Sequence, residues 1–213
     1  MKDLNILFID KPSGMTSFDV IRQLRRKLGR RKMGHAGTLD PLATGLLIVA
    51  LDKATKEISR YMGMPKEYEV LIEFGKVSTT YDAGGEVQAH GDSKALGAVT
   101  RPIFEKALTP FVGDIEQMPP QFSAIRVKGE RAYDLARKGI KVELASRKVH
   151  IDAIEILSWN WPEVRLRIQC GKGTYMRSLA HDLGQALGCG GYVKELRRTA
   201  IGEYRVEQAM RDF

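Results

Sequence analysis

The stretch GHAGTLDPLATGLLIVA, from Gly34 to Ala50, joins two patterns that decide how the chain folds. Its second half enters TGLLIVAL, an apolar run of strand length, which is typical of a central strand buried on both faces. Its first half is a loop that holds Asp40 directly before Pro41. Asp-Pro ordinarily begins a turn, but three glycines nearby would also let a ligand approach the carboxylate closely. A carboxylate held rigidly at the mouth of a buried strand suits nucleophilic chemistry at a sugar carbon.

The segments around this stretch mix strands and helices without a regular alternation. Residues 4–10 read as a short buried strand, and a helix is expected from Ser17 to Leu28 with Phe18, Ile21, Leu24 and Leu28 on its apolar face. Further strands are expected at 66–76, 149–159, 163–170 and 192–204, and further helices at 53–62, 100–109, 132–138 and after a Thr174 cap. Residues 82–99 read as a surface loop. The pattern predicts an α+β fold with a central mixed, mostly antiparallel sheet.

The chain is basic, and its cations cluster. It has 34 Lys and Arg against 26 Asp and Glu, a formal charge of +8, and a pI near 9.5. One cluster runs from Arg22 to Lys32 and a second from Arg126 to Lys148. Each is either a solvated face or a surface for a polyanion.

Several classes of protein are disfavoured. No apolar run approaches the roughly 20 residues of a membrane span, and the N-terminus does not resemble a signal peptide, so we expect a cytoplasmic protein. Cys170 and Cys189 form no metal-binding or disulfide framework and are expected to be buried. GKGT at 171–174 lacks the other residues of a phosphate-binding loop, and the four scattered histidines predict no metal site.

Six motifs, in one order along the chain, resemble the TruB family of tRNA pseudouridine synthases. They are DKPSGMTS at 10–17, GHAGTLDPLATG at 34–45, KEYEV at 66–70, GDIEQMPPQFSAIRVKGERAYDLARKG at 113–139, GKGTYMRSLAHDLG at 171–184 and LRRTAIG at 196–202. The resemblance implies a pseudouridine synthase fold and isomerisation of uridine 55 in the T loop of tRNA. It implies no cofactor, the T arm of tRNA as partner, and a monomer.

The resemblance also assigns roles to residues. Asp40 would be the catalytic carboxylate, either attacking the sugar or base or abstracting a ribose proton, and Arg177 its partner. Tyr68 would stack on the extruded base, and its hydroxyl or phenoxide would help to remove the C5 proton. His35 would fill the space that the base leaves, with a buried structural histidine as the alternative. Lys11 and Tyr175 match positions that shape the pocket for RNA.

Phosphate contacts are assigned to the two basic clusters, which supply affinity rather than sequence information. They include Arg30 and Arg31 in the first, and Arg126 and Lys128 in an RNA-gripping insertion at about 121–148. Residues 1–213 would form one catalytic domain, without the C-terminal PUA-type domain common in the family. Two alternatives remain: a tRNA chaperone that binds without catalysis, and a synthase that acts on another RNA stem-loop.

Overall fold

Strand β3 (Thr44–Leu51) occupies the apolar run of the opening stretch, and each of its residues after Thr44 is buried. It pairs antiparallel with β1 (Ile6–Lys11) and parallel with β12 (Gly191–Ile201), so it is the interior strand that the sequence predicts. The computed structural model describes residues 5–29, 32–90, 93–123, 126–127, 130–131, 135, 139–140 and 142–213.

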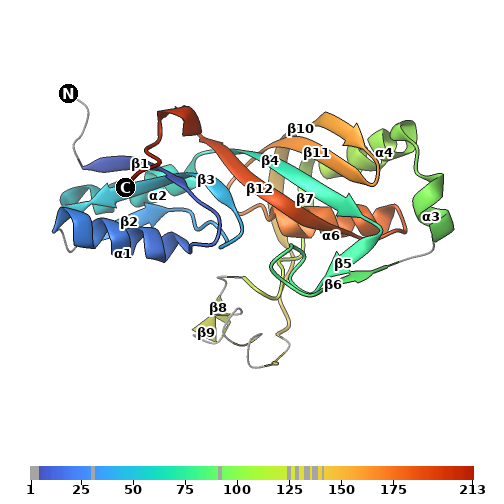
Figure 1. The fold of residues 1–213 in the computed structure, drawn as a ribbon, viewed down its shortest axis with the longest axis horizontal. Helices are drawn as coiled ribbons and strands as arrows, with labels where there is room; N and C mark the ends of the chain where they lie inside the picture. Colours follow the sequence, from blue (N-terminus) through green and yellow to red (C-terminus); the bar gives the residue numbers. More distant parts are fainter. Residues whose placement is uncertain are drawn as a thin grey trace.

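One nine-stranded sheet runs the length of the molecule (Figure 1). Its order is β1-β3-β12-β4-β11-β10-β7, with β2 joined to β3 and β13 joined to β12. The strands not yet introduced are β2 (Met33–Ala36), β4 (Lys66–Phe74), β7 (Gly113–Gln117), β10 (Arg147–Asn160), β11 (Glu163–Cys170) and β13 (Tyr204–Arg205). Among the described residues, every pairing in this sheet is antiparallel except that of β12 with β3. The predicted α+β class with a mixed, mostly antiparallel sheet is confirmed.

The helices cover the sheet in two places. They are α1 (Ser17–Leu28), α2 (Ile58–Gly63), α3 (Ser93–Ala98), α4 (Arg101–Leu108) and α6 (Met176–Ala186), with 3-10 turns at Asp52–Glu57, Thr109–Phe111 and Val206–Gln208. The largest core cluster packs α4 and α6 against β4 and β11, and a second packs α1 against β1 and β3. In Figure 1, α1 lies at one end of the molecule and α3 and α4 at the other.

Helix α1 has the predicted bounds but a different buried face. Thr16 forms a capping box with Asp19, which fixes the start of the helix. Phe18 and Leu28, predicted to be core residues, are 52% and 43% exposed. The Phe18 ring instead lies under the guanidinium groups of Arg22 and Arg25, a cation–π arrangement on the surface. The helix buries Val20, Ile21 and Leu24.

Two local predictions are wrong. The segment 82–99 is not a loop throughout, because β6 (Val87–Ala89) pairs with β5 (Lys76–Ser78) and α3 follows. Thr174 does not cap α6: its hydroxyl donates to the carbonyl of Gly171, and Tyr175 occupies the cap position. Both errors arise where a short element depends on contacts with the sheet rather than on a local repeat. Both cysteines are buried, as expected.

The basic insertion is described only in part. Strands β8 (Arg126–Val127) and β9 (Glu130–Arg131) form an antiparallel pair, while the turn at 128–129 and most of the expected helix at 132–138 lie outside the described residues. In the part of the chain that the structure describes, no helix has the length and apolar character of a membrane span.

Candidate active site

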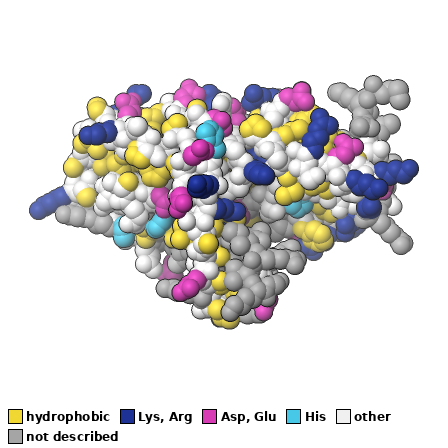
Figure 2. Space-filling model, turned by 180° about the vertical axis from the view of Figure 1, so that it is seen from behind, with side chains coloured by type: hydrophobic (Ala, Val, Ile, Leu, Met, Phe, Trp, Pro, Cys, Tyr) yellow, Lys and Arg dark blue, Asp and Glu magenta, His cyan; other side chains and the backbone are white. Residues whose placement is uncertain are grey.

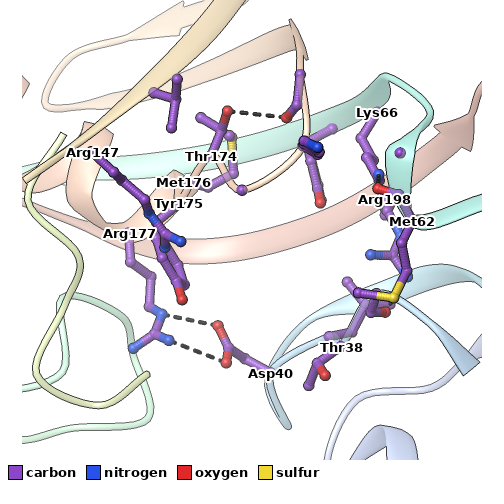
Figure 3. A pocket seen from close by; sticks show the side chains of 18 of the residues that line it. Thr38, Asp40, Met62, Lys66, Arg147, Thr174, Tyr175, Met176, Arg177 and Arg198 are labelled. Carbon is purple, nitrogen blue, oxygen red and sulfur yellow. Dashed lines mark hydrogen bonds and ion pairs between the residues drawn. The ribbon is translucent and has the colours of Figure 1, made fainter. Parts of the chain in front are cut away.

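A pocket of about 690 Å³ opens between the loop before β3, helix α2, strands β4, β10 and β12, and the segment that leads into α6. Asp40, Tyr68, Tyr175 and Arg177, four residues singled out from the sequence, all line it. They come from distant parts of the chain, and the sheet order brings them together because β12 and β4 lie between β3 and β11. Figure 3 shows Asp40 and Arg177 facing each other at one side of this pocket.

The loop that carries Asp40 is held by the segment that follows β1. The Ser17 hydroxyl donates to the carbonyl of Leu39 and accepts from its backbone N–H, at 3.2 and 2.9 Å. The backbone N–H of Gly14 donates to the carbonyl of Pro41 at 2.9 Å. These bonds explain why DKPSGMTS and GHAGTLDP occur together: the first motif is the support of the second.

Gly45, directly after this loop, allows the close approach of β3 to β12. Its φ is +102°, and a Cβ there would lie 2.2 Å from the carbonyl oxygen of Arg198. Any side chain would push the two strands apart at the base of the pocket.

Arg177 and Asp40 form the expected ion pair. Nε of Arg177 lies 2.9 Å from Oδ2 of Asp40, and Nη2 donates to Oδ1 at 3.2 Å (Figure 3). Arg177 is only 4% exposed, and it also donates to the carbonyls of Thr80 and Phe122 at 3.1 and 2.9 Å. Because Nη1 and Nη2 donate to fixed oxygens and Nε lies within ion-pair distance of Oδ2, the guanidinium can hold the carboxylate in one orientation.

A second carboxylate, Asp82, was missed by the sequence reasoning. Its Oδ2 lies 3.5 Å from Nε of Arg177, and its Oδ1 accepts from the Thr80 hydroxyl at 2.6 Å and from the backbone of Gly84 at 3.0 Å. Asp82 is buried. The sequence around it, DAGG, reads as a surface turn, and no local signal distinguishes it from one. Arg177 therefore lies between two carboxylates.

The electrostatic setting of Asp40 opposes ionisation. Burial raises the pKa of this carboxyl above its ordinary value, Arg177 lowers it, and the neighbouring Asp82 raises it again, with burial the largest effect. Its side chain is 34% exposed, and that exposed part faces the pocket. The arginine is therefore needed to keep this carboxylate ionised while a bound ligand excludes water.

The two pocket tyrosines have different settings. Tyr68 lies on β4, and burial raises the pKa of its phenol, although Arg198 opposes the shift. The neutral hydroxyl, not the phenoxide, is therefore its form near neutral pH. The backbone of Tyr175 is clamped by Gln117, whose side-chain oxygen accepts from its N–H at 2.8 Å and whose amide donates to its carbonyl at 3.0 Å.

Lys11 does not fit the predicted contact with RNA. It is 0% exposed, and its ammonium donates to the carbonyls of Pro12, Met15 and Pro41 at 2.8, 2.7 and 3.3 Å. Burial lowers its pKa to about 8. All three bonds tie the β1–α1 turn to the Asp40–Pro41 loop, so Lys11 supports this loop from inside the protein instead of touching a ligand.

His35 lies on β2, outside the residues that line the pocket. It is partly buried, and burial lowers the pKa of its ring, so the ring is neutral near pH 7. Its Nδ1 is buried, and no residue in the described part of the chain forms a hydrogen bond with it. The structure thus leaves open both its predicted role and the structural alternative.

Four of the predicted phosphate contacts cannot be placed. Arg30, Arg31 and Lys128 lie outside the described residues, as does the side chain of Arg126. Of the remaining cations of the first cluster, Lys32 is exposed beyond the end of α1 and the others are on α1. Figure 2 shows Lys and Arg side chains gathered at the end of the molecule to which α1 belongs.

Two buried cations in the pocket wall escaped the sequence reasoning. Arg198 is 1% exposed and donates to the carbonyls of Leu46 and Gly37 at 2.8 and 3.0 Å. Lys66 donates to Met62 and Met64, and burial lowers its pKa to about 8. Charged residues in the strand runs KEYEV and KELRRTAI were the available signal. Within the described residues, no group of three or more His, Cys, Asp or Glu side chains is placed to hold a metal ion.

Comparison with known proteins identifies the family to which this fold belongs. Residues 25–176 match the family described as TruB family pseudouridylate synthase (N terminal domain), and residues 177–212 match the tRNA pseudouridylate synthase B C-terminal domain. The tRNA pseudouridine synthase B of Bacteroides fragilis is 46% identical, over 98% of this chain and 91% of the relative. That of Aquifex aeolicus is 47% identical, over 96% of this chain and 70% of the relative.

Solved structures agree. A chain in the structure of an H/ACA RNP bound to a substrate RNA containing 2′-deoxyuridine aligns with a TM-score of 0.71 and 28% identity over 97% of this chain. One in a Cbf5-Nop10-Gar1 complex aligns with a TM-score of 0.70 and 32% identity over 94%. This chain covers 50% of each. The fold and the carboxylate–guanidinium pair define a pseudouridine synthase. Within that class, the chain belongs to the TruB family.

Proposed function

We propose that this chain isomerises uridine to pseudouridine in tRNA, at position 55 of the T loop, as a monomer in the cytoplasm. The N1–C1′ bond of the uridine breaks, the base turns, C5 bonds to C1′, and the C5 proton is lost. The observation that carries the proposal is the ion pair of Asp40 and Arg177 at the wall of a pocket large enough for a nucleotide. The family and its relatives named tRNA pseudouridine synthase B support the substrate.

The arrangement supports catalysis rather than binding alone. Placing a carboxylate in a pocket meant for a polyanion weakens binding, since like charges repel. This pocket nevertheless contains the carboxylate of Asp40, and its ion pair with Arg177 keeps Asp40 ionised and oriented. Asp40 then acts on the sugar or base of an extruded uridine, and Tyr68 stacks on the base. Asp40, Tyr68 and Arg177 all come from one chain, which supports action as a monomer.

One domain carries this chemistry. Strand β12, in the segment that matches the C-terminal family domain, pairs with β3 and β4 of the N-terminal segment. We therefore treat residues 1–213 as one catalytic domain, with the basic insertion at about 121–148 as a grip on RNA.

The test is direct. The purified chain is incubated with an unmodified tRNA transcript, with the isolated T-arm stem-loop, and with rRNA and mRNA stem-loops, and pseudouridine is mapped at single-nucleotide resolution. We expect conversion at one uridine of the T loop in the first two RNAs. Binding without conversion would favour the chaperone alternative, and conversion only in the other RNAs would replace the proposed substrate.

The rate should depend on pH through Asp40. Protonation removes the reactive carboxylate, and burial raises the pKa of this group. We therefore expect the turnover rate at saturating RNA to fall as pH decreases, with a midpoint above the ordinary value of about 3.9. The check is a rate profile between about pH 4 and pH 8, with RNA binding measured at each pH. His35→Asn should leave the midpoint unchanged. If the midpoint shifts in this variant, the decrease in rate at low pH arises from His35 and not from Asp40.

Tyr68 should act through its ring more than through ionisation. Tyr68→Phe keeps the stacking surface, so we expect RNA affinity within about twofold of the parent, whereas Tyr68→Ala should lose about 1–3 kcal/mol of stacking. Both variants are compared by titration with T-arm RNA. Because the phenol pKa is raised, the alkaline side of the rate profile should be the same in the parent and in any residual activity of Tyr68→Phe. Equal affinities of the two variants would contradict the stacking role.

A further inference from the structure

One cation in the pocket, Arg147, has buried donor atoms that no described residue satisfies. Arg147 begins β10 and lines the pocket, and Figure 3 shows its side chain beside Tyr175 and on the same side as Arg177. Its Nε and Nη2 atoms are buried, and neither has a hydrogen-bond partner among the residues that the structure describes. A buried charged donor without an acceptor costs folding free energy, so the missing acceptor of Arg147 needs an explanation.

The position of Arg147 is fixed by its contacts with Tyr175 and Gln117, which also contact each other. Its guanidinium carbon lies 4.5 Å from the centre of the Tyr175 ring, a cation–π contact that uses the face of the guanidinium and not the N–H groups at its edge. In the pairing of β10 with β7, Arg147 is opposite Gln117. Gln117 is the residue that clamps the backbone of Tyr175 through two hydrogen bonds. The pairing of β10 with β7 therefore fixes the position of Arg147, and the two hydrogen bonds from Gln117 fix the position of the Tyr175 ring on which its guanidinium stacks.

The unpartnered atoms identify the ligand. Nε and Nη2 form one edge of the guanidinium, with two parallel N–H groups that match two oxygens of a phosphate. The exposed side chains of Lys148 and Lys172 line the same pocket and make its entrance positive. Arg177, by contrast, is already paired with the Asp40 carboxylate and has less attraction for an incoming anion. An anion that enters here is drawn to Arg147.

We propose that Arg147 is a preorganised clamp for a backbone phosphate of the RNA next to the extruded uridine, with Tyr175 as its platform and Gln117 as a positioning residue. The proposal rests on the proposed function, since it assumes that the pocket receives a nucleotide of an RNA chain. The phosphate displaces the atoms that now cover Nε and Nη2, and the two hydrogen bonds gained there favour that displacement. Phosphate binding to Arg147 holds the adjoining sugar in one position relative to Asp40, which lines the same pocket.

The test couples a change in the protein to a change in the RNA. A series of T-arm stem-loops carries one neutral methylphosphonate linkage each, at successive positions around the target uridine, and each is titrated with the parent and with Arg147→Met. Met keeps an apolar stem on Tyr175 but has no donors or charge. At one linkage, we expect the methylphosphonate to weaken binding to the parent about tenfold or more and to have no effect on binding to Arg147→Met.

Two further variants guard the interpretation. Arg147→Lys keeps the charge but lacks the parallel donors, so it should lose most of the effect at the same linkage. Lys106→Met removes a charge from an exposed position on α4, outside the pocket, and should show the parent's response at every linkage. Melting curves verify that each variant is folded.

The proposal is overturned if no linkage responds differently in the parent and in Arg147→Met, or if Arg147→Met binds unmodified RNA as the parent does. Conversion of unmodified RNA by the parent is measured in parallel. If uridine is converted but no linkage distinguishes the parent from Arg147→Met, only the phosphate clamp is rejected. If a linkage distinguishes them but no pseudouridine forms, the phosphate site stands and the proposed reaction is rejected.

Discussion

Replacing Asp40 with asparagine is expected to lower pseudouridine formation by at least about 10³-fold while leaving tRNA affinity within about threefold. The amide has the shape of the carboxylate, so the pocket keeps its form, but it has no negative oxygen to act on the sugar or base. Arg177 would still be held by the carbonyls of Thr80 and Phe122 and by Asp82. Loss of the C5 proton offers the assay: release of tritium from tRNA labelled at C5 of uridine.

The matched control is the same chemical change at Asp212, an exposed residue that does not line the pocket. Asp212→Asn should release tritium at the parent's rate. Turnover by Asp40→Asn within tenfold of the parent would contradict the catalytic assignment. A large loss of tRNA affinity in that variant would show instead that Asp40 has mainly a structural role.

Replacing Arg177 with alanine should both stop the reaction and destabilise the fold. The change leaves Asp40 and the buried Asp82 without their shared cation, and breaking a buried pair in this way costs about 3–5 kcal/mol. It also removes donors from the carbonyls of Thr80 and Phe122. The measurement is the free energy of unfolding in urea, compared with that of the parent.

The destabilisation should depend on pH with a definite sign. Without Arg177, the pKa of Asp40 rises further above its unfolded value, because the largest effect that opposes burial and Asp82 is removed. A carboxyl with a raised pKa in the folded state favours folding when protonated, and this contribution is lost as pH rises through that raised pKa. The stability gap between the parent and Arg177→Ala should therefore widen as pH rises above the ordinary carboxyl pKa of about 3.9.

Arg165→Ala provides the comparison, because Arg165 pairs with Glu195 at the surface. Such a pair contributes about 0–1 kcal/mol. If Arg177→Ala is no more destabilising than Arg165→Ala, or if its stability gap narrows as pH rises, the account of the buried ion pair is wrong.

Local signals predicted the elements that depend on local physics. The run from Thr44 to Leu51 is uniformly apolar, and it forms an interior strand. Thr16 and Gly29 mark the two ends of α1, and the helix has the predicted bounds. The face of α1 was less predictable, because Phe18 fits the apolar spacing and yet packs under surface arginines.

The site depended on information that spacing does not contain. Asp40 and Arg177 are separated by 137 positions, and only the resemblance to a family paired them. Asp82 was missed because a turn sequence gives no sign that its carboxylate folds inward. Lys11 came from the family resemblance, as a position that shapes the pocket for RNA, whereas in the structure three carbonyl oxygens hold its ammonium inside the protein. Long-range contacts of single polar side chains leave no periodic trace in a sequence.

The most direct test is a crystal structure of Asp40→Asn bound to a T-arm stem-loop. We predict that the target uridine is extruded into the pocket and that the side chain at position 40 lies about 3–3.5 Å from its reacting sugar or base atoms, with Arg177 beside it. A uridine that stays stacked in the loop, or a ribose held at a different wall of the pocket with no atom near residue 40, would contradict the account.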